Sequence, residues 1–142
     1  MKIKKVSKSM DIISIGLVFR KSDQDDNLYL KIASYSSPIK AFNLTTNELV
    51  IGEESEFSDI KIISKFRCIN NDYHFSSFEN ANIGDVFIIM GRKDIDLYIK
   101  IKEPSDNILP DFNVFNLTTD HLEFIDPDEE IKIFEVVLEY ED

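Results

Sequence analysis

The sequence has few of the residues that cross-linking, metal binding and catalysis require. Cys68 is the only cysteine in 142 residues, which excludes an internal disulfide and a thiolate metal cage. The two histidines, His74 and His121, belong to no nucleophile or metal-ligand motif, and the four glycines form no phosphate-binding loop. We therefore expect a protein that is not an enzyme, with no catalytic residue, no metal and no cofactor.

Long apolar runs are also missing. No stretch approaches the roughly 18 consecutive apolar residues that a membrane span requires. The start of the chain carries Lys2, Lys4 and Lys5 but no apolar run long enough for a signal sequence. We expect a cytoplasmic protein without membrane attachment.

Positive charge is scarce in the last part of the chain. The net charge of the whole chain is −11. Residues 1–102 hold 15 basic and 14 acidic side chains, whereas residues 103–142 hold one lysine and 13 acidic side chains. A distribution this uneven bears on solubility and on binding partners rather than on the fold. It favours a basic partner protein, and it makes nucleic acid an unfavourable ligand.

Two acidic clusters stand in loop-like sequence. The first contains Asp23, Asp25 and Asp26, and the second lies within residues 126–130. Neither has the spacing of a calcium-binding loop. Weak divalent binding is one interpretation, and solvated acidic loops are the interpretation that we favour.

The chain contains four short blocks of sequence twice, in the same order. The pairs are Ile15–Phe19 with Ile83–Phe87, Leu28–Ile32 with Leu97–Ile101, Phe42–Thr46 with Phe115–Thr119, and Ile60–Ile62 with Ile131–Ile133. Their offsets of 68, 69, 73 and 71 residues are typical of matched core elements joined by loops of varying length. This pattern predicts a duplication, with repeats at 10–66 and 78–138 and a connecting segment at 67–77.

Strand signals dominate each repeat. A period of two at 28–32 and 97–101 predicts strands that bury Leu30 and Ile99 and turn the tyrosine and lysine between them toward solvent. The run 131–140 alternates less regularly, which predicts a bulge or a strand that is buried on both faces. A short helix within 67–80 is a further expectation.

Turn and loop residues separate these strands. Pro38 and Pro110 mark the start of a third strand, and Thr46-Asn47 and Thr119-Asp120 predict turns. Thr45 and Glu48 also have capping-box spacing, but the sequence that follows favours a strand. Gly16 and Gly84 are expected at a bulge, a positive φ or a close approach.

Each repeat therefore has five short strands in about 60 residues. This size is typical of a small, partly open barrel of the SH3-like kind. Because a unit of about 60 residues buries only about 60% of its unfolded surface and is marginally stable alone, we expect the two units to pack together. The predicted fold class is all-β, a tandem duplication of such a barrel.

The strand blocks carry a resemblance. In the second repeat they run Ile83-Gly84-Asp85-Val86-Phe87, Leu97–Ile101, Val114–Thr119 and Asp126-Pro127-Asp128-Glu129-Glu130-Ile131. This order resembles uncharacterised small β-domain proteins of bacteriophages and bacteria, with Asn47 and Asp120 in place of the turn glycine of that pattern. The resemblance implies no activity. It implies a phage or mobile-element origin, where small acidic proteins often act on host machinery.

Three functions follow as alternatives. The first is an inhibitor that binds a basic, nucleic-acid-binding host protein, in part by mimicking nucleic acid. The second is an immunity protein that neutralises a cognate toxin. For both, the expected partner-binding residues are Glu123, Asp126, Asp128, Glu129 and Glu130.

The third alternative is a nucleic-acid-binding regulator. Lys31 and Lys100 stand two residues after Tyr29 and Tyr98, on what should be the outer strand face. Interleaved aromatic and basic side chains can form a nucleic-acid platform. We favour the simpler interpretation, in which these side chains cover the sheet with their apolar stems.

Overall fold

The protein is all-β. A computed structural model describes residues 2–6, 18–20, 26–32, 39–51, 60–103 and 112–141. Within these ranges the chain forms strands β1 to β11 and one 3₁₀ turn, η2, without an α-helix. The all-β prediction is confirmed.

The chain divides into two compact units. One, called the N-terminal unit here, comprises residues 2–67 together with 136–142, and the other, the middle unit, comprises residues 68–135. Strands β6 (Ile60–Ser77) and β11 (Glu130–Glu141) each contribute residues to both units. By contacts, the end of β11 therefore groups with the N-terminal unit, although the sequence repeat places it in the second copy.

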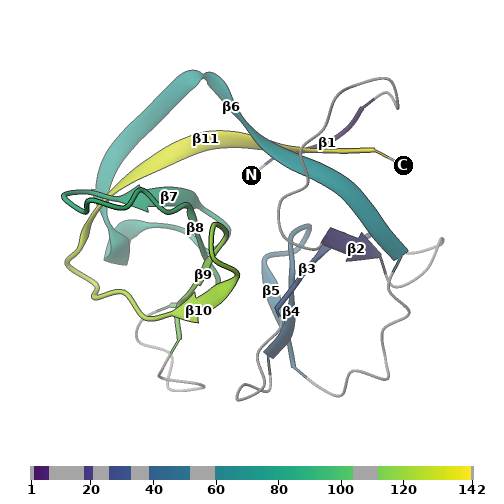
Figure 1. Cartoon of the computed structure of the whole chain (residues 1–142), viewed down its shortest axis with the longest axis horizontal. Helices are drawn as coiled ribbons and strands as arrows, with labels where there is room; N and C mark the ends of the chain where they lie inside the picture. The colour runs from purple at the N-terminus through teal and green to yellow at the C-terminus, as the bar shows by residue number, and fades with distance from the viewer. Residues whose placement is uncertain are drawn as a thin grey trace. The chain divides into compact units, whose positions relative to one another are not determined.

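The middle unit is an antiparallel meander with η2 at its start. Besides its parts of β6 and β11, this unit contains η2 (Phe78–Asn80), β7 (Val86–Ile89), β8 (Tyr98–Lys100), β9 (Val114–Asn116) and β10 (His121–Glu123). The strand order is β10-β9-β8-β7-β11, which Figure 1 shows on the green and yellow part of the trace. This order is open at β10, so the ladders of the described residues do not close into a barrel.

The N-terminal unit repeats this order. Its elements are β1 (Lys2–Val6), β2 (Val18–Arg20), β3 (Tyr29–Lys31), β4 (Ile39–Asn43) and β5 (Glu48–Ile51), with the start of β6 and the end of β11. The described ladders run β6-β2-β3-β4-β5, and β1 pairs in parallel with β11. The order is open at β5.

In the two units, the corresponding strands pair in the same order. Val18 pairs with Leu30 in one unit, and Val86 pairs with Ile99 in the other. One block is shifted, because Phe19 pairs with Lys61 whereas Phe87 pairs with Ile133. Those pairs give an offset of 72, so the predicted match of Ile60–Ile62 with Ile131–Ile133 is wrong by one residue.

The duplicated turn after the third strand is the same at the level of individual hydrogen bonds. Asn43 Oδ1 accepts from the backbone N–H of Thr45 and Thr46 at 2.9 and 3.1 Å. Asn116 Oδ1 accepts from Thr118 and Thr119 at the same two distances. The turns end at Asn47 and Asp120, with φ of 61° and 60°, a conformation that Asn and Asp tolerate better than most residues.

A hydroxyl in each turn reaches across to the preceding loop. Thr45 Oγ1 accepts from Leu28 N–H at 3.0 Å, and Thr118 Oγ1 accepts from Leu97 N–H at 2.9 Å. Thr45 thus belongs to a hairpin instead of a helix cap, as its strand context predicts. Gly84 has a φ of 94°, which fits the expectation for that position, whereas Gly16 lies outside the described residues.

Strand β8 is buried on both faces, and so is most of β3. Leu30 and Ile99 are fully buried, as predicted. Tyr29, Tyr98 and Lys100 are buried as well, so their predicted exposure is wrong. In the middle unit, one hydrophobic cluster forms on the tyrosine side, from Phe78, Ala81, Phe87, Ile89, Tyr98, Val114, Ile125, Ile131 and Ile133.

Aromatic rings organise this cluster. The Phe87 ring stacks on Tyr98 with centroids 5.6 Å apart and also meets Phe78 at 5.6 Å. In the N-terminal unit, Phe19 stacks on Tyr29 at 5.4 Å. Each tyrosine that was expected on the surface is therefore part of a core.

The helix expected within 67–80 is wrong, because residues 67–77 continue strand β6 and only η2 is helical. Strand β11 is buried on both faces at 136–139, one of the two forms expected of it. Pro38, Pro110, Asp23, Asp25 and the side chain of Cys68 lie outside the described residues.

Candidate functional site

The acidic segment 126–130 is held in place by backbone hydrogen bonds from two neighbouring elements. Phe78 N–H donates to the Glu129 carbonyl and Glu79 N–H to the Pro127 carbonyl, both at 2.9 Å. Met90 N–H donates to the Glu130 carbonyl at 2.9 Å. Because η2 and the end of β7 fix its backbone, the segment presents its carboxylates from a defined position.

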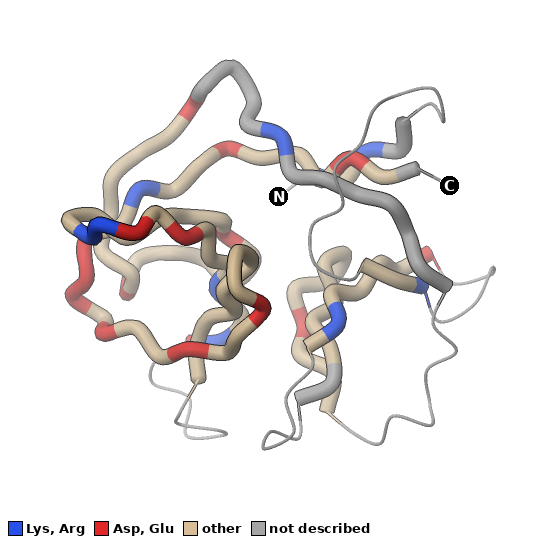
Figure 2. The backbone as a smooth tube through the Cα atoms, in the orientation of Figure 1, with Lys and Arg blue, Asp and Glu red and all other residues tan. Residues whose placement is uncertain are grey.

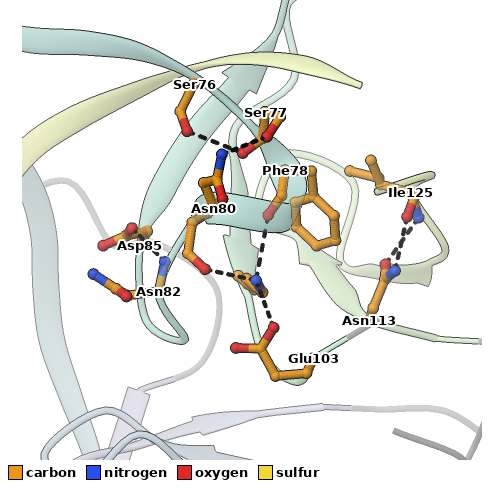
Figure 3. A network of polar contacts seen from close by, with 11 residues as sticks. Ser76, Ser77, Phe78, Asn80, Asn82, Asp85, Glu103, Asn113 and Ile125 are labelled. Atoms are coloured by element: carbon orange, nitrogen blue, oxygen red, sulfur yellow. Dashed lines mark hydrogen bonds and ion pairs between the residues drawn. The ribbon is translucent and has the colours of Figure 1, made fainter. Parts of the chain in front are cut away.

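Ile125, the residue before this segment, is also held by hydrogen bonds. Asn113 Nδ2 donates to the Ile125 carbonyl, and Ile125 N–H donates back to Asn113 Oδ1, both at 2.8 Å. Figure 3 shows the two residues facing each other. Since both are buried, this amide replaces a strand partner that Ile125 would otherwise lack.

A groove runs beside the anchored segment. It has a volume of about 600 Å³ and is lined by Phe75, Ser76, Ser77, Met90, Asp128 and Glu130. Phe75 is 62% exposed and Met90 38% exposed, and both carboxylates are exposed. The groove therefore combines an apolar wall with two carboxylates, all within the middle unit.

An aromatic cluster extends the apolar wall along β6. The Tyr73 ring, 50% exposed, meets Phe75 edge to face with centroids 5.6 Å apart. Lys132 Nζ lies 3.9 Å from the centre of the Tyr73 ring and 5.4 Å from that of Phe134. The protein thus already places one cation over an aromatic ring of this cluster.

The five predicted partner-binding residues do not form one set. Asp128 and Glu130 line the groove together, and Asp126 is exposed at the turn that precedes them. Glu129 is half-buried, and its carboxylate lies 3.7 Å from a guanidinium nitrogen of Arg92. Glu123 is half-buried at the end of β10 and accepts from Asn116 Nδ2 at 2.7 Å.

Arg92 also contacts the buried Tyr98. Its Nη1 donates to the Tyr98 hydroxyl at 3.4 Å. Burial raises the pKa of Tyr98 above its usual value of 10.0, and the negative charge of Glu123 adds to this effect, whereas Arg92 opposes it. Arg92 therefore links the core of the middle unit to the edge of the acidic segment.

Negative charge is concentrated in the middle unit. Residues 68–135 contain 15 acidic and five basic side chains, a balance of −10 out of −11 for the chain. Figure 2 shows acidic positions recurring along the trace of this unit. A basic partner would therefore be attracted to the middle unit as a whole before it meets the groove.

The buried Lys100 is bound inside the middle unit. Its Nζ donates to the Ala81 and Phe78 carbonyls at 2.6 and 3.3 Å and pairs with Glu103 at 3.0 Å. In Figure 3, dashed lines join the Phe78 carbonyl and the Glu103 carboxylate to the same nitrogen atom. Lys100 is 0% exposed, so it cannot contact a nucleic acid, and the predicted Tyr-Lys platform is not formed at 98–100.

The other residues considered for chemistry lie apart from the groove. His74 and His121 are exposed and do not line it. Within the described ranges, no group of three or more His, Cys, Asp or Glu is arranged to hold a metal ion. The helical part of those ranges also contains nothing long and apolar enough to cross a membrane.

Comparison of the chain with protein-family models, with curated proteins and with solved structures finds no match.

The apolar wall is the part of the site that the sequence did not indicate. Phe75 and Tyr73 lie in 67–77, which the repeat marks as a connection, and Met90 directly follows β7. The available signal was the alternation of Tyr73 and Phe75, which places two aromatic rings on one side of a strand. That signal has meaning only once 67–77 is known to be extended.

Proposed function

We propose that this chain is a non-enzymatic binding protein that takes a basic protein partner on the acidic segment of its middle unit. The observation that carries this proposal is the fixed pair Asp128 and Glu130, exposed at the rim of a groove with an apolar wall. A rigid backbone below the carboxylates lowers the entropy lost on binding. The charge balance of −10 in the same unit supports a basic partner.

The partner belongs to one of two classes. A nucleic-acid-binding protein of the host carries a basic surface made for phosphates, which carboxylates can occupy. A nuclease-like toxin carries the same kind of surface, and its neutralisation would make the chain an immunity protein. The identity of the captured partner decides between an inhibitor, including one of phage or mobile-element origin, and an immunity protein.

Capture from a lysate of the encoding organism tests the proposal when charge variants are compared. The test variant is Asp126→Lys, Asp128→Lys and Glu130→Lys, and the matched control is Glu48→Lys, Asp94→Lys and Glu135→Lys, three exposed carboxylates that do not line the groove. Both change the net charge equally. Glu123 and Glu129 are left intact because each has an internal partner.

The test variant is expected to slow association with the captured partner by roughly tenfold or more, because complementary charge acts mainly on the on-rate. Association of the wild type should also slow as salt is raised. Equal rates for the test and control variants would reject the acidic segment as the binding surface. Capture of nucleic acid in place of a protein would reject the basic-partner proposal.

We further propose that residues 10–66 and 78–138 are two copies of one small, SH3-like barrel unit. The support is the shared ladder order and the identical Asn-Leu-Thr-Thr turn. An experimental structure in which β2–β5 and β7–β10 fail to superpose would contradict this origin.

A further inference from the structure

We propose that the groove selects arginine over lysine, receiving an arginine side chain from an extended basic segment of the partner. The inference rests on the proposed function and names the chemistry that its site recognises. It follows from the side chains that line the groove, which include a phenylalanine, a methionine and two carboxylates.

The shape of a guanidinium matches this lining. It is planar, so one face can stack on an aromatic ring while its edge donates two parallel hydrogen bonds to a carboxylate. Phe75 offers such a ring, 62% exposed, and Asp128 and Glu130 offer the carboxylates. A lysine ammonium is a compact, strongly hydrated charge. Because it is not planar, it cannot stack on a ring and donate two parallel hydrogen bonds to a carboxylate at the same time.

The neighbouring ring shows that this cluster holds cations. Lys132 Nζ occupies the face of Tyr73 at 3.9 Å, and Tyr73 supports Phe75 through an edge-to-face contact. Among the described residues, no cation of the chain itself lies over the Phe75 ring. Phe75 is therefore the ring of this pair that remains available to a partner's cation.

The volume fits one bound segment. About 600 Å³ lies within the roughly 300–1,000 Å³ typical of ligand pockets, enough for one arginine side chain with part of its backbone. Ser76 and Ser77 line the same groove. Ser76 Oγ already donates to the Ser77 carbonyl, and Ser77 Oγ accepts from Asn80, as Figure 3 shows, so these hydroxyls are oriented before a ligand arrives.

Fluorescence anisotropy with two labelled peptides tests the selection on the full chain. One peptide alternates arginine with serine, and the second has lysine at every arginine position, so length and net charge are equal. The arginine peptide is expected to bind roughly two- to fivefold more tightly, the range that corresponds to about 0.5–1 kcal/mol for a cation–π contact at an exposed ring. Equal affinity for the two peptides would overturn the proposal.

Three variants locate the selection. Phe75→Leu keeps an apolar side chain but removes the ring, so it should bring the ratio of the two affinities close to one. Ile95→Leu is the matched control at an exposed apolar residue outside the groove, and it should leave the ratio unchanged. Asp128→Asn with Glu130→Gln should weaken both peptides. A ratio that survives Phe75→Leu would overturn the groove as its source.

The two proposals fail in distinguishable ways. If charge reversal slows the captured partner while arginine and lysine peptides bind equally, the acidic segment binds the partner and the arginine inference is wrong. If the arginine peptide is selected through Phe75 while the partner ignores the charge reversal, the groove is specific and the proposed function is wrong. Thermal unfolding of each variant verifies that it is folded in either case.

Discussion

Lys100 is a cationic side chain used as an interior part of the middle unit. Its Nζ joins strand β8 to the carbonyls of Phe78 and Ala81, and it lies 4.8 Å from the centre of the Phe78 ring. The half-exposed Glu103 pairs with it from the solvent side. Lys100 therefore fixes η2 and the residues after it, and η2 in turn fixes the acidic segment.

Replacing Lys100 should destabilise the protein. Lys100→Met keeps most of the volume but leaves the buried Ala81 carbonyl without the donor described here, so we expect a loss of about 1–3 kcal/mol in the free energy of unfolding. The control Lys93→Met, in an exposed turn, should change it by less than about 0.5 kcal/mol. Urea titration of both variants makes the comparison, and equal stabilities would show that the amino group contributes nothing.

Tyr98 gives the protein a specific alkaline sensitivity. Because burial raises its pKa above 10.0 in the folded state, the folded protein holds this proton more tightly than the unfolded chain. The resulting stability is present below about pH 10 and is lost as the pH rises toward the folded pKa. Tyr98→Phe should therefore lose less stability than the wild type between pH 9 and pH 11, measured by urea unfolding. Parallel pH curves would contradict this assignment.

Leu30 and Ile99 occupy equivalent positions in the two units, and both are fully buried. Truncation of either to alanine removes apolar contacts and leaves a cavity, so we expect a loss of about 2–5 kcal/mol at each site. Denaturant titration measures it. A loss below about 1 kcal/mol at both positions would mean that the surrounding side chains refill the space.

At the scale of elements, the repeated Asn-Leu-Thr-Thr turn is the best-defined part of the fold. In both units the asparagine side chain accepts two backbone N–H groups, and the first threonine accepts a third. In the second copy, Asn116 Nδ2 also donates to Asp96 and Glu123 at 3.0 and 2.7 Å, whereas the matching positions of the first copy hold Asn27 and Val50, which carry no carboxylate.

This difference predicts unequal effects of the same substitution. Asn43→Asp keeps the acceptor of the turn, whereas Asn116→Asp places a third carboxylate beside Asp96 and Glu123. We expect Asn116→Asp to cost about 2–3 kcal/mol at neutral pH, and more than Asn43→Asp, because a charge-assisted donor becomes a repelling group. Urea unfolding of the pair checks this, and equal costs would show that the Nδ2 contacts contribute little.

The strands could be predicted from the sequence, but their faces could not. Alternation at 97–101 correctly locates β8, and the burial of Ile99 follows from it. The same pattern wrongly exposes Tyr98 and Lys100, because a period of two cannot distinguish a solvated face from one that another element covers. In this chain η2 and the residues after it cover that face, and no local sequence pattern predicts η2.

The candidate site was predictable to the same partial extent. Residues 126–130 stand out by charge alone, and Asp128 and Glu130 do reach the groove. The internal bonds of Glu123 and Glu129 depend on Asn116 and Arg92, which are distant in sequence. The apolar wall depends on the extended conformation of 67–77, a segment that the spacing of the repeats marks only as a connection.

At the scale of the whole molecule, charge is divided far less evenly than structure. The middle unit carries a balance of −10 and the rest of the chain −1. The ion pair of Arg92 with Glu129 is partly exposed, so it offsets little of the resulting repulsion. Solubility follows from this charge, and so does a cost to the compact state.

Salt should therefore stabilise the protein. Raising sodium chloride from about 20 to 500 mM shortens the screening length to a few ångströms, and we expect the free energy of unfolding to rise on the order of 1 kcal/mol. The variant Asp94→Lys with Glu135→Lys reduces the charge of the middle unit and should show a weaker salt dependence. A fall in stability with added salt would mean that attractive ion pairs outweigh the repulsion.

The duplicated turn also determines in which expression systems the chain can fold. Asn43-Leu44-Thr45 and Asn116-Leu117-Thr118 both match the acceptor sequence for N-linked glycans. Both asparagines are buried in the folded protein, and Asn116 Nδ2, the atom that would carry a sugar, already donates two hydrogen bonds. A glycan added during synthesis would therefore prevent the turn from closing, so a secretory host should yield misfolded chains.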